Sequence, residues 1–154
     1  MNLSVSWILK WKKNLAKSLS KTDSLYPGDA DLLLLNEDNK AVCIFEFKKH
    51  TLSSPISEQC FTNYYPRPDG RKYKRLALLR DYLASKSNSR ILFFVLYYPT
   101  QTYIEQQWKL EVIEGNAFSL RATDSFTFEL PADKSDNEYK KVIEKISQVI
   151  ATHS

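Results

Sequence analysis

The segment Tyr26–His50, YPGDADLLLLNEDNKAVCIFEFKKH, combines two apolar runs with a polar turn between them. Residues 31–36, DLLLLN, are typical of a short β-strand, and residues 41–48, AVCIFEFK, are typical of a second strand. Residues 36–40, NEDNK, have the composition of a turn, so the segment predicts a β-hairpin. The second strand is apolar on both faces as far as Phe45, which indicates a central strand covered on both sides.

Three charged residues, Asp31, Glu46 and Lys48, stand on this otherwise apolar hairpin. Alternate residues of a strand share a face, so Glu46 and Lys48 point the same way. The start of the first strand lies beside the end of the second in an antiparallel hairpin, which brings Asp31 close to Glu46. Two neighbouring carboxylates repel unless a cation lies between them. The pattern therefore predicts a site for Mg²⁺ or Mn²⁺, hard ions that prefer oxygen ligands.

A divalent ion at the hairpin would suit the hydrolysis of a phosphodiester, because it lowers the pKa of a bound water and stabilises charge on a phosphate. Lys48 would orient the water or neutralise charge at the phosphorus, and the main-chain carbonyl of Phe47 is a further candidate ligand. The simpler alternative is an ordinary ion pair between Glu46 and Lys48, worth about 1 kcal/mol or less if exposed. That alternative does not explain the acidic residues Asp29 and Asp31 ahead of the partner strand.

The order Asp31, then Glu46-x-Lys48 at the end of an apolar strand, resembles the PD-(D/E)XK nuclease superfamily, which has the restriction-endonuclease-like fold. The resemblance covers roughly residues 3–65. It implies that Asp31 and Glu46 bind the metal, that Lys48 assists the attacking water, and that a mixed sheet is flanked by helices. Gln59 resembles a glutamine that some members place near the site. The implied activity is that of a metal-dependent endonuclease acting on DNA.

The chain also departs from the pattern of that superfamily. Many members have another acidic residue in the first helix, but residues 1–22 contain none. Asp29 is a third candidate ligand, and Asp31 is favoured over it as the family aspartate because the apolar run follows Asp31 at once. The tyrosine expected four residues after Gln59 is Asn63. A catalytically inactive or partner-dependent nucleic-acid-binding module on the same fold is therefore the alternative.

A basic segment follows the hairpin and surrounds a Pro-Asp-Gly turn. Cations at the start of a helix, together with its N-terminal amides, favour phosphate binding. We expect this segment to position a DNA backbone rather than to identify bases. The simpler interpretation is a solvated helix start. The residues concerned are Arg67, Arg71, Lys72, Lys74 and Arg75.

The rest of the chain predicts one α/β domain over residues 1–154, with a central mixed sheet flanked by helices. Helical spacing of apolar residues and runs of β-branched and aromatic residues locate its elements. The expected helices cover residues 3–19, 56–64, 72–86 and 139–150, and the further strands cover residues 90–98, 108–114 and 126–130.

Composition adds weaker expectations. The net charge of +4 is consistent with a polyanionic partner. Cys43 and Cys60 do not have the spacing of metal ligands, which favours reduced thiols in a cytoplasmic protein. No apolar run approaches the roughly 20 residues that cross a bilayer, so no membrane partner is expected. Cutting both strands of DNA would need two active sites, which makes a homodimer or a larger partner complex plausible.

Overall fold

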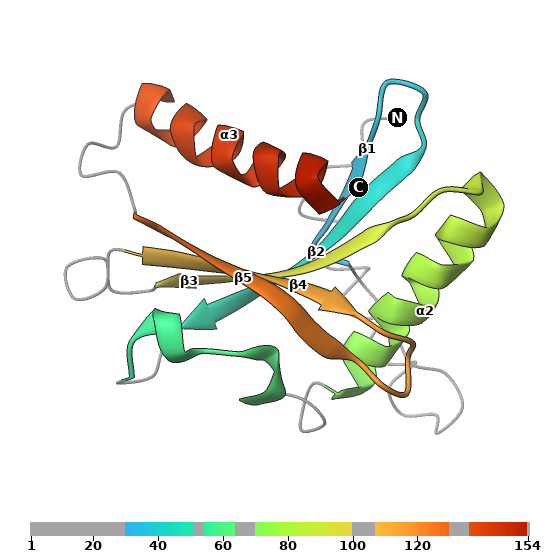
Figure 1. The fold of residues 1–154 in the computed structure, drawn as a ribbon, viewed down its shortest axis with the longest axis horizontal. Helices are drawn as coiled ribbons and strands as arrows, with labels where there is room; N and C mark the ends of the chain where they lie inside the picture. The colour runs from blue at the N-terminus through green and yellow to red at the C-terminus, as the bar shows by residue number, and fades with distance from the viewer. Residues whose placement is uncertain (1–29, 51–53, 64–69, 100–106, 130–135, 154) are drawn as a thin grey trace, which may run out of the picture.

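The structure is a computed structural model. It describes residues 30–50, 54–63, 70–99, 107–129 and 136–153. The helix expected over residues 3–19, and the candidate residues Asp29 and Arg67, lie outside these ranges. Within them, a five-stranded mixed sheet is accompanied by two α-helices, α2 and α3, as Figure 1 shows. The expected α/β class with a mixed central sheet is thus confirmed.

The strands lie in the sheet in the order in which they occur in the chain, β1 to β5. Helix α2 connects β2 to β3, and this is the parallel pair; the other three pairs are antiparallel. Helix α3 follows the last strand. The strands are β1 (Leu32–Leu35), β2 (Ala41–His50), β3 (Leu92–Pro99), β4 (Gln107–Glu114) and β5 (Arg121–Glu129), and the helices are α2 (Gly70–Ser87) and α3 (Asp136–His153).

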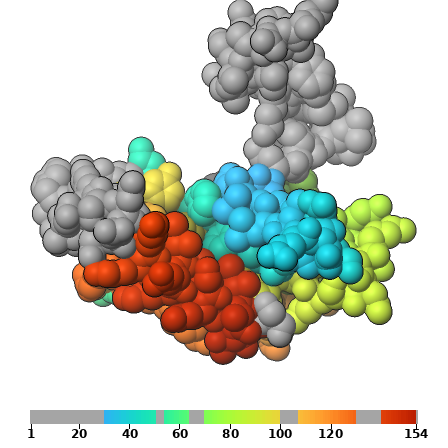
Figure 2. Space-filling view, turned by 90° about the horizontal axis from the view of Figure 1, so that it is seen from above, coloured from blue at the N-terminus to red at the C-terminus, as the bar shows by residue number. Residues whose placement is uncertain are grey.

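The hairpin of β1 and β2 forms because its turn supplies its own hydrogen bonds. The side-chain Oδ1 of Asn36 accepts hydrogen bonds from the main-chain N–H groups of Asp38 (3.1 Å) and Lys40 (2.9 Å). Asn39 has a φ of 58°, a left-handed conformation that asparagine adopts more readily than most residues. Figure 2 shows the hairpin, in blue to cyan, at the surface between α3 and α2.

Two apolar clusters cover the two faces of the sheet, and the alternation along β2 divides its side chains between them. Ile44 belongs to the cluster that includes Tyr73 and Leu76 of α2. Cys43 and Phe45 belong to the other cluster, which includes Val149 of α3. The expectation that β2 is covered on both sides is therefore confirmed.

The helix expected over residues 56–64 is wrong. Two short 3₁₀ turns, η1 (Ile56–Glu58) and η2 (Phe61–Asn63), stand in its place, and Gln59 between them is extended with a ψ of 140°. Side chains of β4 hold this backbone. Lys109 Nζ donates hydrogen bonds to the carbonyl oxygens of Ser57 (3.0 Å) and Gln59, and Glu111 accepts one from the N–H of Phe61 at 2.8 Å. Tertiary hydrogen bonds thus replace those of a helix.

Other element boundaries differ by a few residues from those expected. Strand β5 starts at Arg121 instead of residue 126. Residues 121–125 were not predicted as strand because this segment is mostly polar and shows no apolar alternation; in the structure it is exposed. Strand β2 continues to His50, which is buried and bonded through Nε2 to the carbonyl oxygen of Ser54 at 2.8 Å. In the ranges that the structure describes, neither α-helix is long and apolar enough to cross a bilayer.

The ion pair of Lys109 and Glu111 is buried, so Glu111→Gln should be costly. The change leaves the ammonium of Lys109 without its carboxylate in the interior, which typically lowers the free energy of unfolding by about 3–5 kcal/mol. Glu114→Gln on the same strand is the matched control, because its partner Arg90 is exposed and such pairs contribute about 1 kcal/mol or less. Urea denaturation measures both, and equal losses would contradict a stabilising role for the buried pair.

Candidate metal centre

The hairpin brings the carboxylates of Asp31 and Glu46 to one place. Leu32 pairs with Phe45 across the two strands, so the preceding Asp31 falls beside Glu46. Asp31 Oδ2 accepts a hydrogen bond of 2.7 Å from the main-chain N–H of Phe47. This bond fixes the aspartate at the edge of β2, immediately next to the glutamate.

Two ammonium groups approach the same carboxylates. Lys48 Nζ lies 3.4 Å from Oε1 of Glu46. Lys72 Nζ, from the first turn of α2, lies 2.6 Å from Oε2 of Glu46 and 3.5 Å from Oδ1 of Asp31. The side chain of Glu46 is only 2% exposed, so these charges interact with little screening by water. The site therefore joins two acidic and two basic side chains from β2, α2 and the residue that precedes β1.

The pKa values of the two carboxyl groups are displaced in opposite directions. Burial raises the pKa of Glu46 from its ordinary 4.5 to about 7, with Asp31 adding to the shift and Lys72 opposing it. Partial burial also acts to raise the pKa of Asp31, but the Phe47 N–H, Glu46 and Lys72 outweigh it, so this pKa falls below the ordinary 3.8. Carboxyl groups with shifted pKa values are common at functional sites.

The donor atoms of the site fit a hard divalent cation. Although Lys72 is close, Oε2 of Glu46 is buried and has no hydrogen bond of acceptable geometry to any part of the chain that the structure describes. Carboxylate oxygens from Asp31 and Glu46 are ligands that Mg²⁺ and Mn²⁺ accept, with the Phe47 carbonyl and waters as further ligands. Among the described residues, no group of three or more His, Cys, Asp or Glu side chains is arranged to hold a metal. The described chain thus supplies two acidic ligands.

Lys48 is held by more than its ion pair. Its ammonium lies 5.4 Å from the ring centroid of Tyr73, on the helix that covers this face, which is within the range of a cation–π interaction. The side chain is 14% exposed. Tyr73 and Glu46 together therefore fix the position of the lysine at the end of the hairpin.

Gln59 is buried between the two 3₁₀ turns. Its Nε2 donates a hydrogen bond of 2.8 Å to Oγ of Ser54, and its Oε1 accepts one of 3.3 Å from Nδ2 of Asn63. These bonds attach the amide to its own segment rather than to Glu46 or Lys48.

The basic residues of α2 do not form one surface. Lys72 lies on the carboxylates, whereas Lys74 is directed toward Phe118, with its ammonium 5.9 Å from the ring centroid. Arg71 is exposed and Arg75 is half-buried. The phosphate-binding role predicted from the sequence therefore has three described candidates, Arg71, Lys74 and Arg75, besides Lys72.

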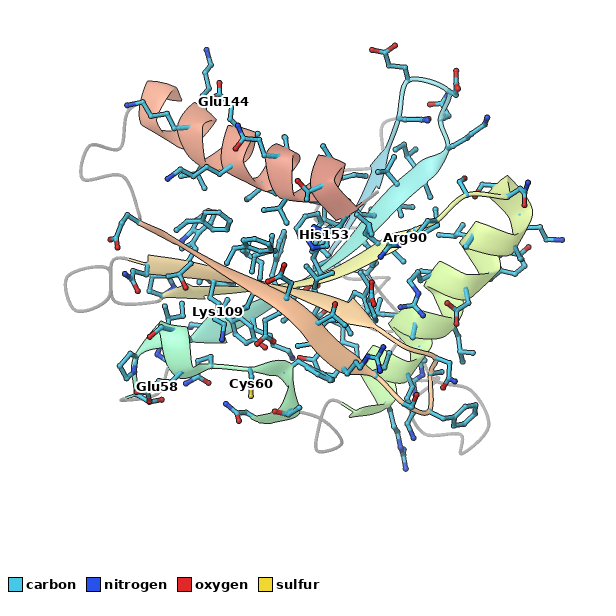
Figure 3. The ribbon with its side chains drawn as sticks, in the orientation of Figure 1. Glu58, Cys60, Arg90, Lys109, Glu144 and His153 are labelled. Carbon is cyan, nitrogen blue, oxygen red and sulfur yellow. The ribbon has the colours of Figure 1, made fainter. Side chains whose placement is uncertain are left out.

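A second buried network on the same face of the sheet was not predicted. Lys109 and Glu111 alternate along β4 as Glu46 and Lys48 do along β2, and the hydroxyl of Tyr97 donates a hydrogen bond of 2.9 Å to Glu111. Figure 3 shows Lys109 on the side of the sheet where Glu58 and Cys60 lie. The available signal was the Lys-x-Glu alternation within the apolar sequence WKLEVI.

Arginines also line a hollow between the C-terminal half of α2 and the strands β3 and β4. Each of them has acidic partners already. Arg80 binds Asp81 at 2.7 Å, and Arg90 binds Glu114 at 2.5 Å. This hollow lacks the buried carboxylates that mark the hairpin site.

Comparisons of the chain with models of protein families, with curated proteins and with solved structures find no match. The function is therefore inferred from the side chains at the hairpin and from their chemistry.

Because the folded chain holds the proton of Glu46 more tightly than the unfolded chain, its stability should fall as the pH rises from about 4.5 to about 7. The glutamine side chain of the Glu46→Gln variant cannot ionise, so the variant should lack this pH dependence of stability. The stability of the variant relative to wild type should therefore increase across that interval. Urea denaturation at a series of pH values measures the difference, and a constant difference would contradict the raised pKa. Because the pKa of Asp31 is lowered on folding, its protonation reduces stability only as the pH falls below about 3.8. The contributions of Asp31 and Glu46 to the pH dependence of stability are therefore separable.

Proposed function

We propose that this chain is a metal-dependent endonuclease that hydrolyses phosphodiester bonds in DNA. The observation that carries the proposal is the buried carboxylate of Glu46, with Asp31 beside it and the ammonium of Lys48 at 3.4 Å. Two neighbouring carboxylates repel each other, and burial of one of them adds to the cost, so this pair is more readily explained by function than by stability.

The chemistry follows from the ligands. Asp31 and Glu46 hold Mg²⁺ or Mn²⁺, with the Phe47 carbonyl as a further ligand and Asp29 as a reserve. The ion, when bound, supplies a water of lowered pKa and stabilises negative charge on the phosphate. Lys48, held against Glu46 and Tyr73, orients the attacking water or neutralises charge that develops at the phosphorus. Gln59 positions the segment that follows the hairpin.

The fold supports an assignment to the restriction-endonuclease-like class. The acidic hairpin occupies one side of a mixed sheet, and the helix that follows it returns the chain to a strand parallel to β2. This connection places the first turn of α2 over the carboxylates. The resemblance of Asp31 and Glu46-x-Lys48 to the PD-(D/E)XK pattern thus has a matching structural context.

DNA is the favoured substrate because basic residues flank Lys72 in the sequence. Arg71, Lys74 and Arg75 of α2 follow Arg67 in the sequence, and the chain carries a net charge of +4. Contacts of this type bind the sugar-phosphate backbone without reading bases. A homodimer or a larger assembly would supply the two active sites that a double-strand cut requires, and we place the protein in the cytoplasm.

A second candidate function is a nucleic-acid-binding module that is inactive alone or active only with a partner. Its motivation is that the described residues provide two acidic ligands and that Lys72 already neutralises them. Calorimetric titration with Mn²⁺ separates the candidates, because a binding module needs no metal. Absence of Mn²⁺ binding would favour the module over the enzyme.

Wild-type protein should convert supercoiled plasmid to nicked or linear DNA in Mg²⁺ or Mn²⁺, and EDTA should stop the reaction. Lys48→Ala should lower the rate by about 10²–10⁴-fold, the usual contribution of a group that assists proton transfer. Lys49→Ala is the matched control, because this exposed neighbour lies on the other face of β2 and should cut at the wild-type rate.

Gel electrophoresis of the plasmid products gives these rates. Cutting by Lys48→Ala at the wild-type rate, or no cutting by wild type on plasmid and branched DNA, would reject the enzymatic proposal.

A further inference from the structure

Lys72 links the two carboxylates of the site. A single ammonium contacts Oε2 of Glu46 in β2 at 2.6 Å and Oδ1 of Asp31, the residue before β1, at 3.5 Å. Lys48 contacts the other oxygen of Glu46. Lys72 therefore takes the place between the carboxylates that a bridging cation would take, which distinguishes it from the phosphate-binding lysine expected from the sequence.

A metal ion and the ammonium of Lys72 compete for the same oxygen. A Mg²⁺ ligand lies about 2.0–2.1 Å from the ion, so an oxygen already held by an ammonium would bring two cations close together. Two carboxylates and two ammoniums also balance in charge, and a divalent ion would add two positive charges to a neutral set. Entry of the ion therefore favours the departure of one ammonium.

Lys72 is the lysine that can depart. Its side chain is 27% exposed, against 14% for Lys48, and its flexible stem can turn toward solvent. Lys48 is held over the ring of Tyr73. The two lysines thus differ in exposure to solvent at the same carboxylate.

We propose that Lys72 is a built-in counterion that neutralises Asp31 and Glu46 before metal binding and is displaced by the divalent ion. The inference rests on the metal site of the proposed function and adds a competitor to it. Displacement of Lys72 reduces the net affinity of the metal. Removal of its charge should therefore strengthen metal binding, although it removes an ion pair from the fold.

The test is a calorimetric titration of Mn²⁺ into wild type and Lys72→Met at mildly alkaline pH. The variant should bind Mn²⁺ more tightly by roughly 5- to 150-fold, the usual range for coupling between two sites. Lys86→Met makes the same chemical change at the C-terminal end of α2, beside Tyr82, and should retain wild-type affinity. Adding Asp31→Asn to Lys72→Met should abolish the gain, which would locate the ion at these carboxylates.

Thermal denaturation checks that each variant is folded, and Lys72→Gln replaces Lys72→Met if the latter is not. Equal or weaker Mn²⁺ binding by the folded Lys72 variant would overturn the counterion role and leave the enzymatic proposal intact, since the plasmid assay decides that independently. Mn²⁺ binding by neither wild type nor variant would overturn the counterion role, and absence of plasmid cutting as well would overturn both. A purely structural ion pair predicts a lower melting temperature with no gain in affinity.

Discussion

The burial of Glu46 is the constraint on which the site depends. A carboxylate on the covered face of a central strand is costly unless cations or hydrogen bonds compensate its charge or it takes up a proton. Lys48 can do so from the same strand, but Lys72 reaches Glu46 only when α2 packs against the sheet. The docking of α2 through Tyr73 and Leu76 therefore sets the electrostatics of the hairpin as well as the apolar core.

The same face of the sheet carries two Glu–Lys pairs that are compensated to different degrees. Val95 of β3 pairs with Glu46 on one side and with Glu111 on the other. Glu111 receives hydrogen bonds from the Phe61 N–H and the Tyr97 hydroxyl in addition to its ion pair, as expected of a structural carboxylate. Glu46 relies on ion pairs, and its Oε2 has no well-oriented donor in the described chain. Two carboxylates that flank the same residue of β3 thus differ in how completely hydrogen bonds satisfy them.

Local sequence predicted the features that depend on local chemistry. The alternation of β2 and the turn around Asn36 indicated the hairpin, and the hairpin alone indicated that Asp31 and Glu46 would be neighbours. Residues 56–64 have the sequence pattern of a helix, but Lys109, some fifty positions away, donates hydrogen bonds to carbonyl oxygens that would be acceptors within that helix. The placement of Lys72 likewise requires the docked helix, so the sequence identified the carboxylates but not the cation between them.

The connection between β2 and β3 has a consequence for folding kinetics. Hairpins close within about 1–10 µs because their strands are adjacent in the chain, whereas pairing distant parallel strands requires a long loop to close first. The β1–β2 hairpin is of the first kind, and β2–β3 is of the second. Asp31 and Glu46 are therefore expected to meet before α2 brings Lys72 to them, which makes their mutual repulsion a barrier early in folding that protonation or a dissolved cation would lower.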